Sequence, residues 1–401
     1  MRKEINYIKH FLQFCCLLVV FNSLYFISSQ KHWSPIDEYA HMDYIEKLSV
    51  GQCPRISDTL SSEIIYDIQH VPNKSVAKKI QQINEMGLAL YSYQAKHPPI
   101  YYSLLVLPNL VLKYVDMPIF ERVEWLRILS FGFYMLGVIM LIPVFHQLRN
   151  MDFNIPDYFI YLVCIISLLI FPHERYGLGN NALSPLMIHA SIYYLLRLFQ
   201  TSKPKYLHLL TLLTTISCGV ALTNIFIAPF ILLLGVLFIL KKRMYLTILE
   251  QFIFMLPALG IGFIWKYLSQ PDPIIGASIE LLLKTYIPAS MVNFTLFLKV
   301  MINDLCTIPL GNYTVNFGII FLSLLIVSCL RLAFQFKTFK ENHPWLLVSF
   351  VFIFILLIKM YVLNRYVDSV TWVAFRHYLG FVGILSTGIV ALFLPAKYIK
   401  H

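Results

Sequence analysis

Residues 124–147 read EWLRILSFGFYMLGVIMLIPVFHQ, and apolar runs of this kind decide the fold class. The run is close to the ~20 residues that an α-helix needs to cross the hydrocarbon core of a bilayer. About ten runs along the chain are read as spans: 10–29, 124–147, 157–172, 182–199, 207–224, 226–240, 245–267, 316–334, 344–362 and 375–395. The sequence therefore predicts an all-α integral membrane protein, with residues 1–401 as a single polytopic domain.

The composition agrees with this class. Of the 401 residues, 58% are hydrophobic and 13% are charged, which is about half the charged fraction of an ordinary soluble domain. The net charge of +11 is typical of basic cytoplasmic loops, so we expect the lipid bilayer, and not nucleic acid, as a partner. The seven cysteines have no paired spacing, which argues against a disulfide framework and against a zinc site.

The distribution of Lys and Arg indicates how the chain is oriented. Residues 100–114 form an apolar segment that contains Pro108 and Asn109, and we interpret it as lying along the membrane. Ten spans then place every basic cluster on one side: Arg2, Lys3 and Lys9; Arg149; Arg197, Lys203 and Lys205; Lys241, Lys242 and Arg243; Arg331, Lys337 and Lys340; Lys397 and Lys400. By the positive-inside rule this side is cytoplasmic, and so are both termini.

Most candidate reactive groups then lie on the outer side. The first outer loop covers residues 30–123 and is long enough for amphipathic juxtamembrane helices, and a second sizeable outer loop covers 268–315. The short tails and compact loops favour a bacterial inner membrane, with these loops facing the periplasm. Charge counting alone therefore predicts an outward-facing site.

An acidic pair and a histidine follow the first span directly, in the stretch WSPIDEYAH that ends at His41. Ser34 suits a helix N-cap and Pro35 suits the first helical position, so we expect a helix on which Asp37 and His41 share a face. Glu38 adjoins them. A partly desolvated carboxylate beside another acid has a raised pKa and becomes a better general base. The alternative is a solvated pair of acids on the loop surface.

Other residues on the outer side are candidates for binding an anionic group. His97 stands in the rigid stretch KHPPIYY, and Arg127 lies at the outer end of the second span. Arg127 would clamp a phosphate with two hydrogen bonds, or would only extend to the interface to reach water. Arg365 precedes the last span, and Arg376 and His377 open it from the outer side, where charges are costly and usually functional.

Together these motifs resemble a known family. An Asp-Glu pair after the first span, then His-Pro-Pro, then Arg-x-Leu-Ser in the next span is similar to the GT-C membrane glycosyltransferases of the protein O-mannosyltransferase and aminoarabinose-transferase type. The likeness covers roughly residues 10–200. It implies a GT-C-like fold and the inverting transfer of a sugar from a polyprenyl-phosphate donor to a glycan, lipid or protein acceptor. It implies no cofactor, and a divalent metal fits the scheme without being required.

The resemblance also implies roles for individual residues. Asp37 would be the base that deprotonates the acceptor, with Glu38 beside it. Arg127 and Arg376 would hold the carrier phosphate as it leaves, and His97 would form the floor of the pocket. The other candidates for binding the donor phosphate or the substrate are His41, Asn181, Arg365 and His377.

The second outer loop departs from the family pattern. Where relatives carry an acid, this chain has Asn180 and Asn181, and the nearest acid is Glu174. Either Glu174 substitutes as the second catalytic acid, or that carboxylate is dispensable, or activity has been lost.

Three other functions stay open. A transporter or flippase of a lipid-linked solute would place polar groups at the bilayer midplane on broken helices, often in repeated halves. A glycan polymerase or ligase would also use cations of the outer loops. A catalytically silent relative acting as an assembly partner would explain Asn180 and Asn181. The clustering of charges at one face, with no evident repeat, favours the transferase.

Overall fold

A computed structural model of the chain describes these residues: 2–30, 33, 38–55, 58–70, 92–153, 155–169, 177–221, 224, 228–242, 307–310, 313–316, 320, 323–324, 326–327, 330 and 382–390. The predicted spans at 245–267 and 344–362 lie outside these residues. Those at 316–334 and 375–395 are described only in part.

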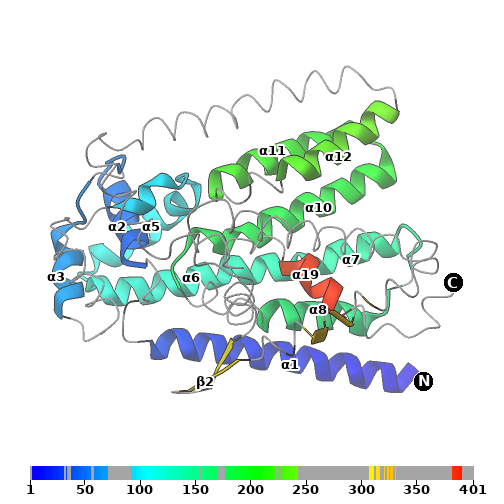
Figure 1. Cartoon of the computed structure of the whole chain (residues 1–401), viewed down its shortest axis with the longest axis horizontal. Helices are drawn as coiled ribbons and strands as arrows, with labels where there is room; N and C mark the ends of the chain where they lie inside the picture. The colour runs from blue at the N-terminus through cyan, green and yellow to red at the C-terminus, as the bar shows by residue number, and fades with distance from the viewer. Residues whose placement is uncertain are drawn as a thin grey trace, which may run out of the picture.

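Most helices of the body of the molecule run roughly along its longest axis (Figure 1). Their bounds are α1 Arg2–Ser29, α6 Ile119–Ile139, α7 Leu141–Arg149, α8 Asp157–Leu169, α10 Ser184–Thr201, α11 Pro204–Val220, α12 Ala228–Lys241 and α19 Val382–Val390. A short 3₁₀-helix, η2 Asn180–Leu183, leads into α10. The helix α10 is central because it packs against α6, α7, α11 and α12.

Three helices of the described part are long and apolar enough to cross a membrane. They are Tyr7–Ser29, Ile119–Arg149 and Asn180–Thr201, and each overlaps a span predicted from the sequence. Shorter apolar helices are Ile100–Tyr114, Asp157–Leu169 and Ile231–Lys241. The chain is therefore a helical protein with three candidate membrane-spanning helices, which indicates a multi-pass membrane protein.

The second of these spans is broken at Met140, between α6 and α7. Pro143 has no N–H to bond the carbonyl of Ile139, which disfavours a continuous helix. His189 of α10 lies against the same place, with its Nδ1 2.7 Å from the carbonyl oxygen of Gly137. Because a carbonyl only accepts, Nδ1 carries the proton. A proline within the span and a hydrogen bond from a neighbouring helix thus accompany the break.

Further helices gather at one end of the molecule, at the left of Figure 1. Their bounds are α2 Glu38–Ser49, α3 Ser62–His70, η1 Tyr93–Lys96 and α5 Ile100–Tyr114. The helix α5 packs against α2, α6 and α11. A buried apolar cluster that includes Tyr39, Tyr102 and Leu178 connects these helices to the start of α10. The predicted first outer loop therefore contains helices, and it ends where α6 begins.

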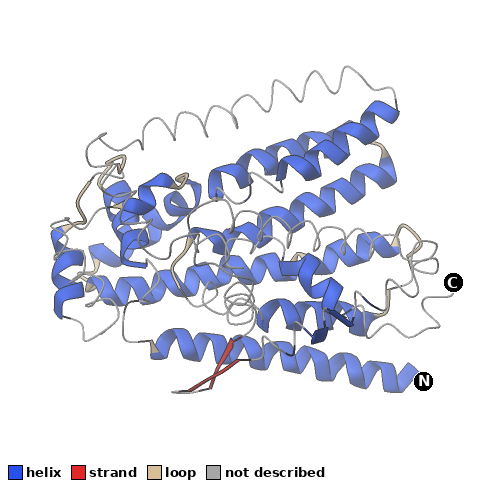
Figure 2. Ribbon diagram, in the orientation of Figure 1, coloured by secondary structure: helices blue, strands red, loops and turns tan. Residues whose placement is uncertain are grey.

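Two short strands interrupt the helical pattern. They are β1 Thr307–Leu310 and β2 Tyr313–Asn316, which pair antiparallel with Thr307 opposite Asn316 (Figure 2). They lie in and just beyond the predicted outer loop 268–315, where an all-α fold has no strand. The residues between them in the sequence are Gly and Asn, a pair typical of two-residue hairpin turns. Each strand has only four residues, so the described part of the chain remains helical apart from this hairpin.

Candidate functional site

A fully buried ion pair joins the predicted acidic segment to the second span. Arg127 of α6 donates from Nε to Oε1 of Glu38 at 2.8 Å and from Nη2 to Oε2 at 2.6 Å, the fork geometry that makes such pairs strong. Its Nη1 donates to the carbonyl of Gln30 at 3.0 Å. The backbone N–H of Leu178 donates to Glu38 Oε1 at 2.9 Å. Glu38 thus holds three segments of the chain together.

The pair bears on the roles expected of Arg127 and Glu38. Both side chains are 0% exposed, and each has the other as a charged partner. Arg127 therefore does not merely extend to the interface to reach water. Its guanidinium also lies 5.5 Å from the ring centroid of Phe120. That it also contacts a carrier phosphate stays a prediction.

The predicted base, Asp37, lies outside the described residues, but the residues that border its segment are fixed. Trp33 is 1% exposed and donates from Nε1 to Asp67 Oδ2 of α3. Its ring meets Phe120 edge to face, with centroids 6.1 Å apart. Burial raises the pKa of Asp67, although the Trp33 hydrogen bond opposes the rise. Trp33 and Glu38 are therefore two buried residues on either side of that segment.

Both predicted histidines have partners where α2 packs against α5. His41 Nδ1 is 2.8 Å from the hydroxyl of Tyr102, and the two rings stack with centroids 5.7 Å apart. The hydroxyl of Tyr44 donates to the backbone carbonyl of His97 at 2.8 Å. Burial raises the pKa of Tyr44 well above its usual value. The structure thus brings the α2 helix and the His-Pro-Pro stretch together through buried aromatic side chains.

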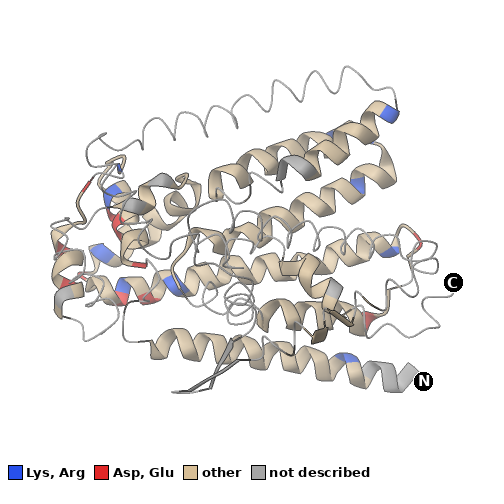
Figure 3. Ribbon diagram, in the orientation of Figure 1, with Lys and Arg blue, Asp and Glu red and all other residues tan. Residues whose placement is uncertain are grey.

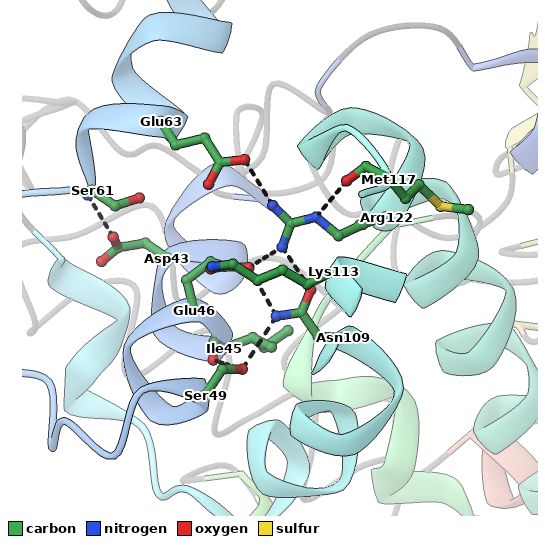
Figure 4. Close-up of polar contacts among 10 residues, drawn as sticks. All are labelled: Asp43, Ile45, Glu46, Ser49, Ser61, Glu63, Asn109, Lys113, Met117 and Arg122. Carbon is green, nitrogen blue, oxygen red and sulfur yellow. Dashed lines mark hydrogen bonds and ion pairs between the residues drawn. The ribbon is translucent and has the colours of Figure 1, made fainter. Parts of the chain in front are cut away.

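A network of charged side chains fixes the other end of α2 (Figure 4). Glu46 accepts hydrogen bonds from Asn109 Nδ2 and Lys113 Nζ, each at 2.8 Å, and forms a buried ion pair with Arg122. Arg122 also donates to Glu63 of α3 at 2.8 Å. Burial by itself would raise the pKa of Glu46, but the bonds from Lys113 and Asn109 and the charge of Arg122 lower it below its usual value. The network joins α2, α3, α5 and α6.

Asp43 fixes the connections around α2. It accepts from the backbone N–H of Ser61 at 2.8 Å and from Ser92 Oγ at 2.5 Å, and it pairs with Lys47 Nζ at 2.8 Å. The sequence reasoning gave no role to Arg122, Asn109 or this aspartate. A usable signal was present, since acids are scarce in the chain and α2 alone carries several.

The second outer loop is described from residue 177 onward. Asn180 and Asn181 form the start of η2 and are buried, and Asn180 Nδ2 donates to the carbonyl of Val220 at 3.3 Å. Of the remaining predicted site residues, four lie outside the described part of the chain: Glu174, Arg365, Arg376 and His377. The proposed cationic half of the site is therefore a prediction.

The described residues define a polar assembly at one end of a helical membrane protein. No three or more His, Cys, Asp and Glu side chains in the described part of the chain are grouped so that they could hold a metal ion. Figure 3 shows that acidic residues gather at the end that carries α2 and α3. In comparisons with known proteins, no family model, curated protein or solved structure matches the chain.

Proposed function

We propose that this chain is a GT-C-type membrane glycosyltransferase that moves a sugar from a polyprenyl-phosphate donor to an acceptor at the outer face of the membrane. The acceptor is a glycan, a lipid or a protein. In this proposal the chain crosses a bacterial inner membrane ten times, with both termini in the cytoplasm and the site facing the periplasm.

The observation that carries the proposal is the contact set of Glu38. This residue adjoins Asp37 in the chain, pairs with Arg127 of α6, and accepts from the backbone of Leu178 in the second predicted outer loop. Tyr44 adds a bond to the carbonyl of His97. The segments on which the family resemblance rests are therefore neighbours in space, as a shared site requires.

The chemistry proposed is a single displacement. Asp37 takes the proton of the acceptor hydroxyl, and the acceptor oxygen attacks the anomeric carbon of the sugar. The bond from that carbon to the phosphate oxygen breaks, and its electron pair leaves with the carrier phosphate. Arg365, Arg376 and His377 would stabilise the departing negative charge. Because Arg127 pairs with Glu38, its main role in this scheme is to position the acidic segment.

The test is transfer by the purified full chain in lipid vesicles. A panel of polyprenyl-phosphate sugars is supplied, and release of the carrier phosphate is measured for wild type, Asp37→Asn and Glu174→Gln. Loss of a general base predicts a fall of about 100-fold or more for Asp37→Asn. The matched control is Asp116→Asn, because Asp116 is exposed and has a positive φ of 53° that Asn tolerates.

The outcomes separate the alternatives. Wild-type turnover that Asp37→Asn leaves unchanged would remove the base assignment. A fall in the Glu174→Gln variant would show that Glu174 replaces the missing acid of the second loop. Donor movement across the vesicle membrane without turnover would instead indicate a transporter.

A further inference from the structure

A second group of polar side chains lies where α10 begins and α11 ends. Asn180 belongs to η2, Ser184 to the first turn of α10 and Ser217 to the last turn of α11, and Asn224 follows that helix. All four are at most 3% exposed, and none carries a charge. We refer to these four residues as the amide cluster.

The orientation of Asn224 follows from its partners. Its Nδ2 is 3.1 Å from the backbone carbonyl of Ser217 and 3.0 Å from Oγ of Ser184. A carbonyl oxygen only accepts, so the amide nitrogen faces Ser217 and the oxygen Oδ1 is turned away from it. Within the described part of the chain, this Oδ1 and the hydroxyl of Ser217 are buried without a hydrogen-bond partner.

Two such atoms, on residues that are hydrogen-bonded to each other, require an explanation. A buried polar atom that lacks a partner costs roughly 1–3 kcal/mol, so native proteins rarely leave neighbouring pairs unsatisfied. Asn224 Oδ1 needs a donor, and the Ser217 hydroxyl can donate or accept. A ligand hydroxyl meets both needs. A phosphate oxygen at neutral pH does not, because it would face the negative end of the amide dipole.

The amide cluster borders on the proposed catalytic site. The chain from Leu178, which donates to Glu38, runs directly into Asn180 and Ser184. On the α11 side, a Cβ built on Gly219 would come within 2.3 Å of the Ile100 side chain. Ile100 begins α5 directly after the His-Pro-Pro stretch. The cluster therefore lies close in the chain to segments that contact both loops that the proposed function uses.

We propose that the amide cluster binds a hydroxyl group of the donor's sugar, an inference that rests on the function proposed above. Asn224 Oδ1 accepts the sugar hydroxyl, and Ser217 Oγ completes its hydrogen bonding. The cluster then contributes to the choice of sugar, while charged residues elsewhere bind the carrier phosphate. A resident water offers the same donor chemistry and is the competing occupant.

The experiment measures affinities of the purified full chain in nanodiscs for undecaprenyl phosphate and for its glucose, mannose, galactose and arabinose conjugates. Ser217→Ala removes an unpartnered hydroxyl and should not harm folding, and Asn224→Ser removes the amide oxygen. Ser191→Ala is the matched control, because Ser191 is equally buried but bonds the carbonyl of Met187 within α10.

We expect wild type to prefer one sugar conjugate over the bare carrier, and both cluster variants to reduce this preference about three- to tenfold. Affinity for the bare carrier should stay unchanged, as should every value for Ser191→Ala. A conjugate of the deoxy form of the preferred sugar should bind wild type without that preference. In Ser217→Ala, removing the same sugar hydroxyl should reduce the affinity no further.

If the cluster variants keep the wild-type preference, the inference is overturned, and a resident water is the occupant of the cluster. In that case Asp37-dependent turnover would still support the proposed function. If wild type neither turns over nor prefers any of the conjugates, both the function and the inference fail together.

Discussion

At the scale of single residues, the Glu38–Arg127 pair is the most consequential contact. Removing one partner of a buried ion pair leaves an uncompensated charge, which typically costs about 3–5 kcal/mol. We therefore expect Glu38→Gln to lower the free energy of unfolding by about that amount, because Arg127 is 0% exposed. Titration of the detergent-solubilised protein with SDS, followed by circular dichroism, measures the change.

The control for this prediction is Glu121→Gln, which removes an exposed acid from the same helix, α6. It should change the unfolding free energy by no more than about 0.5 kcal/mol. The double variant Glu38→Gln with Arg127→Met should recover part of the loss, since no buried charge is then left unpaired. Equal costs for Glu38→Gln and Glu121→Gln would contradict the structural role.

The lowered pKa of Glu46 makes a prediction about pH. An acid whose folded pKa lies below its unfolded value, about 4.3, stabilises the fold above that value and loses this contribution as pH falls through the folded pKa. Glu46→Gln should therefore flatten the fall in Tm as the pH drops below the unfolded value of about 4.3. Glu63→Gln is the comparison, because that side chain is 49% exposed. If the Tm of Glu46→Gln falls with pH as steeply as that of wild type, ionised Glu46 does not stabilise the fold as proposed.

Sequence reasoning selected several residues of the assembly but not their partners. Glu38, His41, His97 and Arg127 stood out because charged and imidazole groups are scarce beside apolar spans. Arg127 is 89 positions from Glu38 in the chain, and Tyr102 is 61 positions from His41. Such pairings depend on how helices pack, and no local pattern encodes them.

At the scale of elements, the contact between α6 and α10 depends on a glycine. A Cβ built on Gly137 would lie 2.6 Å from the backbone nitrogen of Leu186 and 2.7 Å from Cβ of Pro185. Backbone atoms cannot move aside cheaply, so Gly137→Ala should cost about 1–3 kcal/mol of unfolding free energy. A fall in Tm of the purified protein would report the change.

Gly132 provides the matched control within the same helix. A Cβ there meets nothing within 4 Å, and alanine favours helix over glycine by up to about 1 kcal/mol. Gly132→Ala should therefore leave Tm unchanged or raise it slightly. If Gly137→Ala changes Tm no more than Gly132→Ala does, α6 and α10 do not approach each other as closely as in this structure.

Hydropathy predicted the long elements well because a membrane span is a long and uniform signal. Three predicted spans coincide with candidate membrane-spanning helices, and their limits differ from the prediction by a few residues. The break at Met140 was not predicted, although Pro143 marks its position in the sequence. The hairpin of β1 and β2 was missed since four-residue strands leave almost no periodic pattern.

At the scale of the whole molecule, the two ends differ in charge: one carries acidic and basic residues together, and the other carries mostly Lys and Arg (Figure 3). Acidic residues gather at the end that holds α2 and α3, and Lys and Arg mark the far ends of α7 and α12 (Figure 3). In a membrane protein the basic end faces the cytoplasm. Two exposed positions test this orientation, namely Cys53 in the first predicted outer loop and Lys242 just after α12.

A membrane-impermeant maleimide should label Cys53 in intact right-side-out vesicles. Partial burial raises the pKa of this thiol, so labelling is run at mildly alkaline pH, where more thiolate is present. Cys53→Ser gives the background from the other cysteines. In that background, Lys242→Cys should gain label only after the vesicles are permeabilised, because the proposed ten-span topology places it on the cytoplasmic side. Labelling of Lys242→Cys in intact vesicles would put both positions on one surface. This result would contradict the proposal that the acidic assembly faces the periplasm.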